Sequence, residues 1–537
     1  MIKNSHPSLL LLLVLLALGC NQTVSTNNEQ EMLPNRWPNA VSYEIFVQSF
    51  ADSNSDSIGD INGMTTKLDY LEDLGIENIW LMPINPSPSY HKYDVTDYKG
   101  IHPDYGTMDD FKNFVNESHK RNIRVTIDLV INHCSSRHPW FLSALNPSSE
   151  YRDYFIWSTK EEIEEAGNLE KAKTGDSDNT RQWNEVNGQD ELYFSYFYSG
   201  MPDLNYDNPK VREEVYAIGK YWLTEVGVDG FRLDAAKHIY PDDRADDNHA
   251  FWAEFKETME SYNPDVYLVG EVWADLETQA AFAKGFDALF NFDLAFSILE
   301  SVKNQRVLSA SIFEDAWKIN ETGSPVELFN KSEKAFKNYN KDYVNTTFLT
   351  NHDQNRVMSF LGNNQEQALL AASILMTLPG APYIYYGEEI GMPGMKPDPN
   401  IREPFLWTAL PDSMRTTWMT AKYANDLTVP PLDIQMKDEG SIYNHYRSLI
   451  RTRRASEILS LGELSNVNLE DNELLAFKRS FKGNELLVLH NLSDSLKKCN
   501  IGNFNNKMFS TNNQISINSN ELTLPPFQSV ILSQSNK

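Results

Sequence analysis

The sequence predicts an α/β fold: a (β/α)8 TIM barrel with an inserted subdomain after strand 3 and a C-terminal antiparallel β domain. Two observations predict the barrel. Short apolar runs alternate with longer helical patterns, and polar residues follow the ends of several runs, where such barrels gather their chemistry. An open doubly wound sheet is the structural alternative. The predicted strands span residues 43–47, 79–82, 124–129, 230–233, 266–271, 288–292, 346–349 and 383–386.

The first residues have the layout of a secretory signal. Lys3 precedes an apolar run that ends at Cys20, and this run is too short to span a bilayer comfortably. We expect residues 1–19 to be a signal peptide, Cys20 to be lipidated, and residues 20–35 to form a flexible polar tether. The chain is then lipid-anchored in the cell envelope, at the outer membrane and facing the periplasm or the surface; simple secretion is the alternative. Only Cys134 and Cys499 remain, so stability does not rest on a disulfide framework.

The rest of the chain divides into three predicted parts. The barrel occupies residues 36–456 and contains an insertion at about 134–206, which is rich in Trp, Tyr, Asn and Asp and too long for a simple loop. After a helical pattern at 443–454, short alternating runs such as 474–479 and 485–489 predict a β-sandwich over residues 457–537.

The composition excludes one class of partner. The chain has 75 acidic and 47 basic residues, a formal net charge of −28, and would repel nucleic-acid phosphates. It is 41% hydrophobic and 12% aromatic, which is enough to bury a large core.

Carboxylates stand at the ends of the predicted strands, where burial without a purpose is costly. Asp128, Asp234 and Glu271 end the third, fourth and fifth strands, and Asp353 follows the seventh. Cleavage of a glycosidic bond requires one carboxylic acid that protonates the leaving oxygen and one carboxylate that attacks or stabilises C1. Converging carboxylates in one barrel mouth meet that requirement.

Local environment separates two of these roles. Arg232 shares a strand face with Asp234 and would keep that carboxyl ionised. Glu271 precedes the apolar residues Val272 and Trp273, so we expect its pKa to be raised, as a general acid needs.

Four segments carry a resemblance to a known family: residues 128–133, 230–238, 270–273 and 351–353. In order and spacing they resemble the signature regions of the α-amylase family, glycoside hydrolase family 13, and the likeness extends from Trp37 to the C-terminus. The resemblance implies that Asp234 is the nucleophile, Glu271 the general acid/base and Asp353 the carboxylate that grips sugar hydroxyls. It also implies a retaining mechanism, with nucleophile and acid/base carboxyls about 5–5.5 Å apart. Its implied sugar-binding residues are His91, Tyr93, Asp128, His133, Arg232, Lys237, His238 and His352.

Two calcium sites are predicted. Asp52, Asn54, Asp56 and Asp60 place oxygen donors at alternate positions, to which the Ile58 carbonyl would add. The segment departs from an EF-hand but resembles the calcium loop of oligo-1,6-glucosidases and some bacterial amylases; a solvated polar turn is the alternative. The family resemblance implies a second Ca²⁺, whose ligands would be Asn132, Asp203 and the His238 carbonyl.

The predicted activity within the family depends on short segments that resemble particular subfamilies. Lys237-His238 resembles endo-acting α-amylases, whereas residues 93–98 and 201–205 resemble the subfamily between oligo-1,6-glucosidases and neopullulanases. Together they favour an α-amylase that cleaves α-1,4 bonds in starch-like glucans and maltooligosaccharides, in association with other glycan-uptake proteins. An oligosaccharide α-glucosidase or neopullulanase-like enzyme that also accepts α-1,6 bonds is the alternative. A non-catalytic glucan-binding relative is a further one, although such relatives typically lose part of the triad.

Overall fold

A computed structural model describes residues 32–168, 181–313 and 316–534. The predictions of a signal peptide, of lipidation at Cys20 and of most of the tether lie outside the described residues. Within them, no helix combines the length and apolar character that crossing a membrane requires.

Eight parallel strands form the barrel, in the order β12-β13-β1-β2-β3-β7-β8-β9. A parallel bridge between Phe290 and Thr346 joins the two ends of this order, so the sheet closes. Each strand overlaps a predicted run, and the closure confirms the TIM barrel over the open sheet. The strands are β1 (Ser42–Ile45), β2 (Asn78–Leu81), β3 (Arg124–Leu129), β7 (Gly230–Leu233), β8 (Tyr267–Gly270), β9 (Ala288–Leu289), β12 (Thr346–Thr347) and β13 (Ala381–Tyr385).

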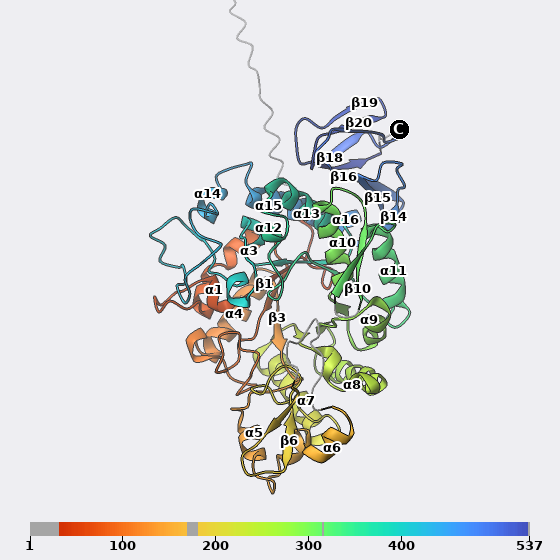
Figure 1. The fold of residues 1–537 in the computed structure, drawn as a ribbon. Helices are drawn as coiled ribbons and strands as arrows, with labels where there is room; N and C mark the ends of the chain where they lie inside the picture. The colour runs from red at the N-terminus through yellow and green to blue at the C-terminus, as the bar shows by residue number, and fades with distance from the viewer. Residues whose placement is uncertain (1–31, 169–180, 314–315, 535–537) are drawn as a thin grey trace, which may run out of the picture. The chain divides into compact units, whose positions relative to one another are not determined.

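Helices surround the strands (Figure 1). The helices outside the insertion are α1 (Val47–Phe50), α2 (Ile61–Thr66), α3 (Leu68–Leu74), α4 (Met108–Lys120), α7 (Pro209–Tyr221), α8 (Ala245–Tyr262), α9 (Leu276–Phe282), α10 (Phe292–Lys303), α11 (Pro325–Lys337), α12 (Val357–Phe360), α13 (Gln365–Thr377), α14 (Leu432–Gln435), α15 (Ile442–Arg454) and α16 (Glu457–Leu461). Short helical turns include η4 (Ala236–His238), η5 (Asp242–Arg244), η7 (Glu388–Ile390) and η8 (Asp398–Ile401).

Helix α4 illustrates how the sequence forms these helices. Thr107 and Asp110 make a reciprocal capping box that satisfies the first orphan N–H groups. Phe111, Phe114 and Val115 then recur at helical spacing and are buried against the barrel.

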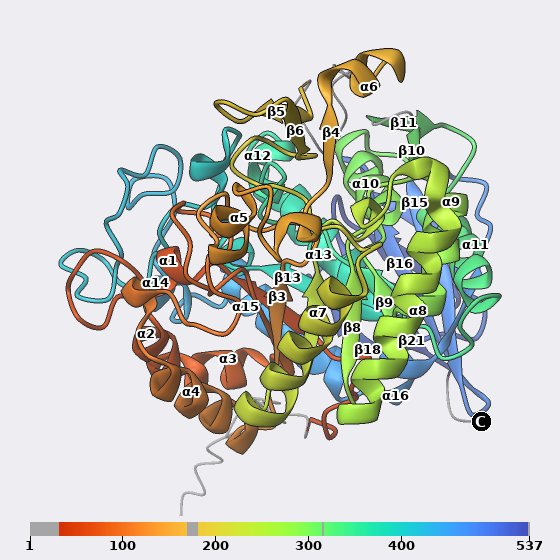
Figure 2. The same cartoon turned by 90° about the horizontal axis from the view of Figure 1, so that it is seen from below.

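The segment between β3 and α7 has its own secondary structure. A small antiparallel sheet in the order β4-β6-β5 contains β4 (Trp157–Thr159), β5 (Trp183–Glu185) and β6 (Glu191–Phe194), accompanied by α5 (Pro139–Ala144) and α6 (Lys160–Glu165). A second excursion, the hairpin β10 (Ser309–Phe313) and β11 (Ala316–Asn320), follows α10 and packs on it (Figure 2).

After α16 the chain forms two antiparallel sheets. One has the order β14-β15-β16-β21-β18 and the other β17-β20-β19. Apolar residues of both sheets, including Leu487 and Leu522, form a separate buried cluster. The strands are β14 (Glu463–Asn466), β15 (Leu474–Phe481), β16 (Asn484–Asn491), β17 (Lys497–Asn500), β18 (Asn506–Ser510), β19 (Ser516–Asn518), β20 (Glu521–Leu524) and β21 (Ser529–Ser533).

Candidate active site

A cleft of about 850 Å³ collects most of the predicted site residues. Such a volume is typical of small-molecule and sugar sites. Asp128, Arg232 and His352 are almost fully buried and do not line the cleft, but each contacts a residue that does. The predicted residues that line the cleft are His91, Tyr93, His133, Asp234, Lys237, His238, Glu271 and Asp353.

Arg232, on β7, links the carboxylates at three neighbouring strand ends. Its Nη1 donates to Asp234 Oδ1 at 2.7 Å and to both oxygens of Asp128 at 2.9 Å. Its Nη2 lies 2.7 Å from Glu271 Oε2. Because β3, β7 and β8 pair in parallel register, their ends bring these side chains together.

Glu271 has the environment of a general acid. It follows the end of β8, and its side chain is 20% exposed. Burial raises the pKa of the Glu271 carboxyl to about 7, although Arg232 lowers it in part. This agrees with the direction predicted from the neighbouring apolar residues.

Asp353 lines the same cleft and is held by two cations. Its Oδ1 accepts from Arg402 Nη2 at 2.9 Å, and its Oδ2 lies 3.1 Å from His352 Nε2. Burial opposes ionisation, but His352 and Arg402 together hold the pKa of Asp353 well below its ordinary value. Asp353 is therefore an anion that can accept hydrogen bonds from sugar hydroxyls.

Two residues that support this carboxylate, one through His352 and one directly, were not found from the sequence. Glu44 on β1 contacts His352 Nδ1 at 2.5 Å. Burial lowers the pKa of His352, but Asp353 and Glu44 outweigh burial and raise it to about 10. Arg402 follows the short turn η8, in a stretch without strand or helix periodicity, so no sequence signal placed it near Asp353.

Aromatic and imidazole rings line one side of the cleft. Tyr93 donates to Asp128 Oδ2 at 3.1 Å, and its ring is stacked with His352 at a centroid distance of 5.6 Å. Burial lowers the pKa of His91 to about 4, so this ring is neutral near pH 7. His133 contacts the Tyr93 carbonyl through Nε2 at 3.2 Å.

The residues after the β7 carboxylate line another part of the cleft. Lys237 Nζ lies 3.6 Å from Asp242. The His238 ring is stacked on Tyr196, from the segment before α7, with centroids 3.9 Å apart. The structure thus brings Lys237 and His238 into the same cleft as the triad.

The predicted calcium loop curls back on itself. Ser55 and Ser57 adopt left-handed φ values of 68° and 84°, which lets Asp52 accept three backbone N–H groups of the loop. Asp60 accepts from Ser53 and caps α2. Asn54 donates to Asp56, which also accepts the Ile58 N–H. No three His, Cys, Asp or Glu side chains of the described residues gather in metal-binding geometry, so calcium here stays a prediction.

The second predicted metal position has one unsatisfied oxygen. Asn132 Nδ2 donates to Asp203 Oδ2 at 3.4 Å, while the buried Asn132 Oδ1 accepts no hydrogen bond from the described residues. A buried acceptor without a donor is costly. An amide oxygen and a carboxylate are ligands that suit a hard cation, so this pair fits Ca²⁺ chemically.

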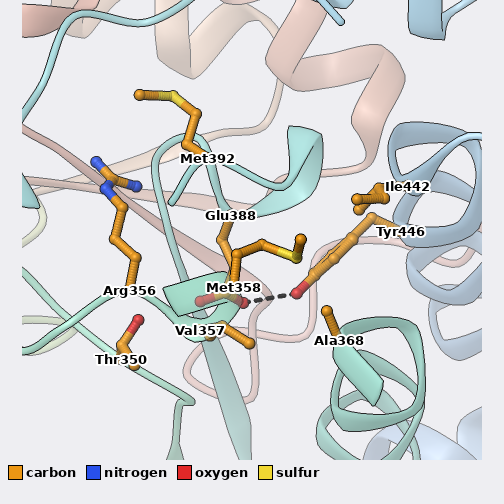
Figure 3. Close-up of a pocket in the computed structure, with 9 residues that line it drawn as sticks. All are labelled: Thr350, Arg356, Val357, Met358, Ala368, Glu388, Met392, Ile442 and Tyr446. Carbon is orange, nitrogen blue, oxygen red and sulfur yellow. Dashed lines mark hydrogen bonds between the residues drawn. The ribbon is translucent and has the colours of Figure 1, made fainter. Parts of the chain in front are cut away.

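A small pocket of about 10 Å³ is lined by Thr350, Glu388 and Tyr446, among others (Figure 3). Thr350 lines both this pocket and the cleft. Glu388 points into the pocket and accepts from Tyr446 at 2.8 Å, and burial raises the pKa of Glu388 to about 8. This volume holds about one water molecule, so the pocket is no substrate site.

Comparison with known proteins assigns the chain to a family. Residues 44–462 match the model "Alpha amylase, catalytic domain", and residues 474–531 match "Alpha-amylase SusG C-terminal domain". Alpha-amylase 3 of Dictyoglomus thermophilum is 44% identical over 502 residues, covering 92% of this chain and 93% of that protein. Alpha-amylase SusG of Bacteroides thetaiotaomicron is 29% identical and covers 84% of each chain.

A solved structure agrees in fold. The crystal structure of an α-amylase from H. orenii superimposes with a TM-score of 0.81 at 41% identity, covering 92% of this chain and 99% of that one. The predicted family resemblance is therefore confirmed. The chain belongs to the α-amylase family of glycoside hydrolases, glycoside hydrolase family 13.

Proposed function

We propose that this glycoside hydrolase is an endo-acting α-amylase that cleaves α-1,4 bonds of starch-like glucans with retention of configuration. One observation carries the proposal. Arg232 holds Asp234 and Glu271 at the same cleft floor, and Asp353 lines the same cleft. The Lys237-His238 pair, which resembles that of endo-acting α-amylases, favours internal cleavage of long chains.

Each carboxylate has a separate task. The Asp234 carboxylate attacks C1 while Glu271 gives its proton to the leaving glycosidic oxygen, so the C1–O bond breaks and a covalent glycosyl-enzyme forms. Glu271, now ionised, takes a proton from water, whose oxygen attacks C1 and releases Asp234. Asp353 accepts hydrogen bonds from hydroxyls of the same glucose and favours the distorted ring.

Tyr93 and His91 complete the pocket for that glucose. The Tyr93 ring lies at the cleft wall, where a sugar C–H face can stack on it. His91 Nδ1 accepts the Tyr93 N–H at 3.1 Å, so the neutral ring carries its proton on Nε2 and can donate one hydrogen bond to a sugar without adding charge.

The proposal includes calcium and a lipid anchor. Asp52, Asn54, Asp56, Asp60 and the Ile58 carbonyl would hold one Ca²⁺, and Asn132, Asp203 and the His238 carbonyl a second. The ions would brace the loops and take no part in bond cleavage. The apolar run ending at Cys20 supports a lipid-anchored protein of the cell envelope that works beside other glycan-uptake proteins.

Product analysis tests the proposal. Protein lacking residues 1–20 would be incubated with amylose, pullulan, isomaltose and maltotriose beside Glu271→Gln as control. Early mixed maltooligosaccharides from amylose, with the α anomer formed first by NMR, support a retaining endo-amylase. Glucose released only from short oligomers, or panose from pullulan, would favour the alternative of an oligosaccharide α-glucosidase or a neopullulanase-like enzyme. No turnover of any substrate would refute hydrolysis.

A further inference from the structure

A line of aromatic rings leads along the cleft away from the catalytic carboxylates. Trp273, two residues after Glu271, has its ring centroid 5.9 Å from that of Phe296 on α10. Phe296 is in turn 4.2 Å from Trp317 on the β10–β11 hairpin. All three rings line the same cleft as the triad. The cleft therefore extends beyond the glucose that reacts.

Trp317 is fixed in position although its side chain is exposed. One face of its indole is stacked on Phe296 with an angle of 9° between the rings. Its Nε1 donates to Glu300 Oε1 at 3.2 Å, which prevents rotation in the ring plane. The residue is nevertheless 40% exposed. A tryptophan held in this way presents a flat apolar face to solvent without losing further rotamer entropy when a ligand binds.

The hairpin register explains why this ring faces the cleft. Trp317 pairs with Ile312, and Ile312 is buried against the aromatic cluster that contains Phe296. Opposed residues of an antiparallel pair share a face, so Trp317 points to the α10 side. Phe313, one position further along β10, points to the other face, is 48% exposed and does not line the cleft.

A polar side chain on the cleft wall also lacks a partner. Gln354, which follows Asp353, lines the cleft, and neither polar atom of its amide bonds to any of the described residues. A buried amide left in this state is costly unless a ligand or water satisfies it. Sugar hydroxyls both donate and accept, so they match an amide in either orientation.

We propose that Trp317 is the platform of an outer glucose-binding subsite, which binds α-1,4-linked chains long enough to reach from Asp234 to the β10–β11 hairpin. This inference rests on the proposed glucan hydrolysis and adds a residue that sets chain-length preference. A planar indole suits the C–H face of a glucose ring, and cleft positions lined by aromatic residues are the usual places for such contacts. Short substrates do not reach the ring and gain nothing from it.

A length series of substrates tests the role of the ring. Trp317→Ala is expected to lower kcat/KM for maltoheptaose about tenfold, the effect of one lost aromatic contact, and to leave maltotriose within about twofold of wild type. Trp317→Leu, which still covers Phe296, should show the same length-dependent loss. Trp317→Phe, which restores a flat ring, should recover most of it.

Phe313→Ala is the matched control, because it removes an exposed ring from the same hairpin outside the cleft. It should behave like wild type at both chain lengths. The inference is overturned if Trp317→Ala and Trp317→Leu match wild type on maltoheptaose, lose equally on both substrates, or are reproduced by Phe313→Ala. If wild-type protein hydrolyses no glucan, the proposed function itself fails. If wild-type protein hydrolyses maltoheptaose but the Trp317 variants show no length-dependent loss, only the subsite inference fails.

Discussion

Arg232 faces more negative charge than one guanidinium can balance. Its two terminal nitrogens contact Asp128, Asp234 and Glu271, and its side chain is 1% exposed. Three ionised carboxylates around one buried cation would leave two uncompensated charges in a region of low dielectric. Burial raises the pKa of both Glu271 and Asp128 to about 7, so a proton on either carboxyl relieves this repulsion. Glu271 lines the cleft and Asp128 does not, so Glu271 is the acid that a substrate can reach. The carboxyl groups around Arg232 thus provide both a protonated acid, Glu271, and an ionised carboxylate, Asp234.

The pH profile should report this proton. A raised pKa means that Glu271 is protonated below about pH 7 and loses the proton as pH rises through that value. Because the protonated form acts first, kcat/KM for maltoheptaose is expected to fall on the alkaline side near pH 7. In Glu271→Gln, activity should fall about 10²- to 10⁴-fold and this alkaline limb should vanish.

A substrate with a good leaving group provides the control. α-Maltosyl fluoride needs little acid assistance, so the first step of Glu271→Gln on this substrate should be far less impaired. Wild-type protein that keeps full kcat/KM on maltoheptaose up to pH 9 would contradict the assignment of Glu271.

Arg402 is expected to position Asp353. It donates through Nη2 to Asp353 and through Nε to the His352 carbonyl at 2.9 Å, a pair of bonds that lysine cannot reproduce. Loss of one charged hydrogen bond costs about 1.5–3 kcal/mol, so Arg402→Lys should lower kcat/KM about 10- to 100-fold. Steady-state kinetics should show this loss without a change in Tm beyond that of Arg244→Lys, a surface arginine paired with Asp207. Equal losses of activity in both variants would argue against positioning.

Strands and strand-end residues could be read from the sequence, whereas residues from irregular segments could not. Asp234 and Glu271 are predictable because a short, mostly apolar strand-like run ends just before each of them. Arg402 and Trp317 lie on a turn and on a hairpin that no periodicity ties to the barrel. Their contacts depend on tertiary packing, through Asp353 and Phe296 respectively. The order of barrel strands followed from the alternation of elements; the path of the long connections did not.

The predicted calcium loop after α1, residues 52–60, leads to a prediction for metal removal. If Ca²⁺ binds there, it stabilises the folded state by mass action, and a chelator should lower Tm by several degrees. Asp56 is exposed, so Asp56→Asn removes one ligand charge with little other structural cost. Differential scanning fluorimetry should show a smaller chelator effect in this variant than in wild type. Asp265→Asn, an exposed aspartate outside the loop, should keep the full effect; an unchanged wild-type Tm with chelator would refute both calcium positions.

A buried arginine, Arg479, joins the C-terminal sheets to the barrel, and a second one, Arg453, binds the same end of α13 from within the barrel. Arg479 on β15 donates to the Thr377 and Gly462 carbonyls at 2.6 and 2.8 Å. Arg453 on α15 donates to the Met376 and Leu378 carbonyls at 2.9 and 2.6 Å. Through Thr377, Met376 and Leu378 these cations meet the carbonyls at the C-terminal end of α13, which carries the negative end of the helix dipole.

This joint predicts that the barrel and the sheets unfold together. Arg479→Met keeps most of the apolar stem but leaves two buried carbonyls without donors, a cost of about 1–3 kcal/mol each. A lower Tm in a single calorimetric transition is expected, with kcat/KM at 25 °C unchanged because Arg479 does not line the cleft. Lys478→Met, at a partly exposed neighbouring position, should leave Tm almost unaltered. Two resolved transitions in wild type would contradict the joint, since the sheets would then melt independently of α13.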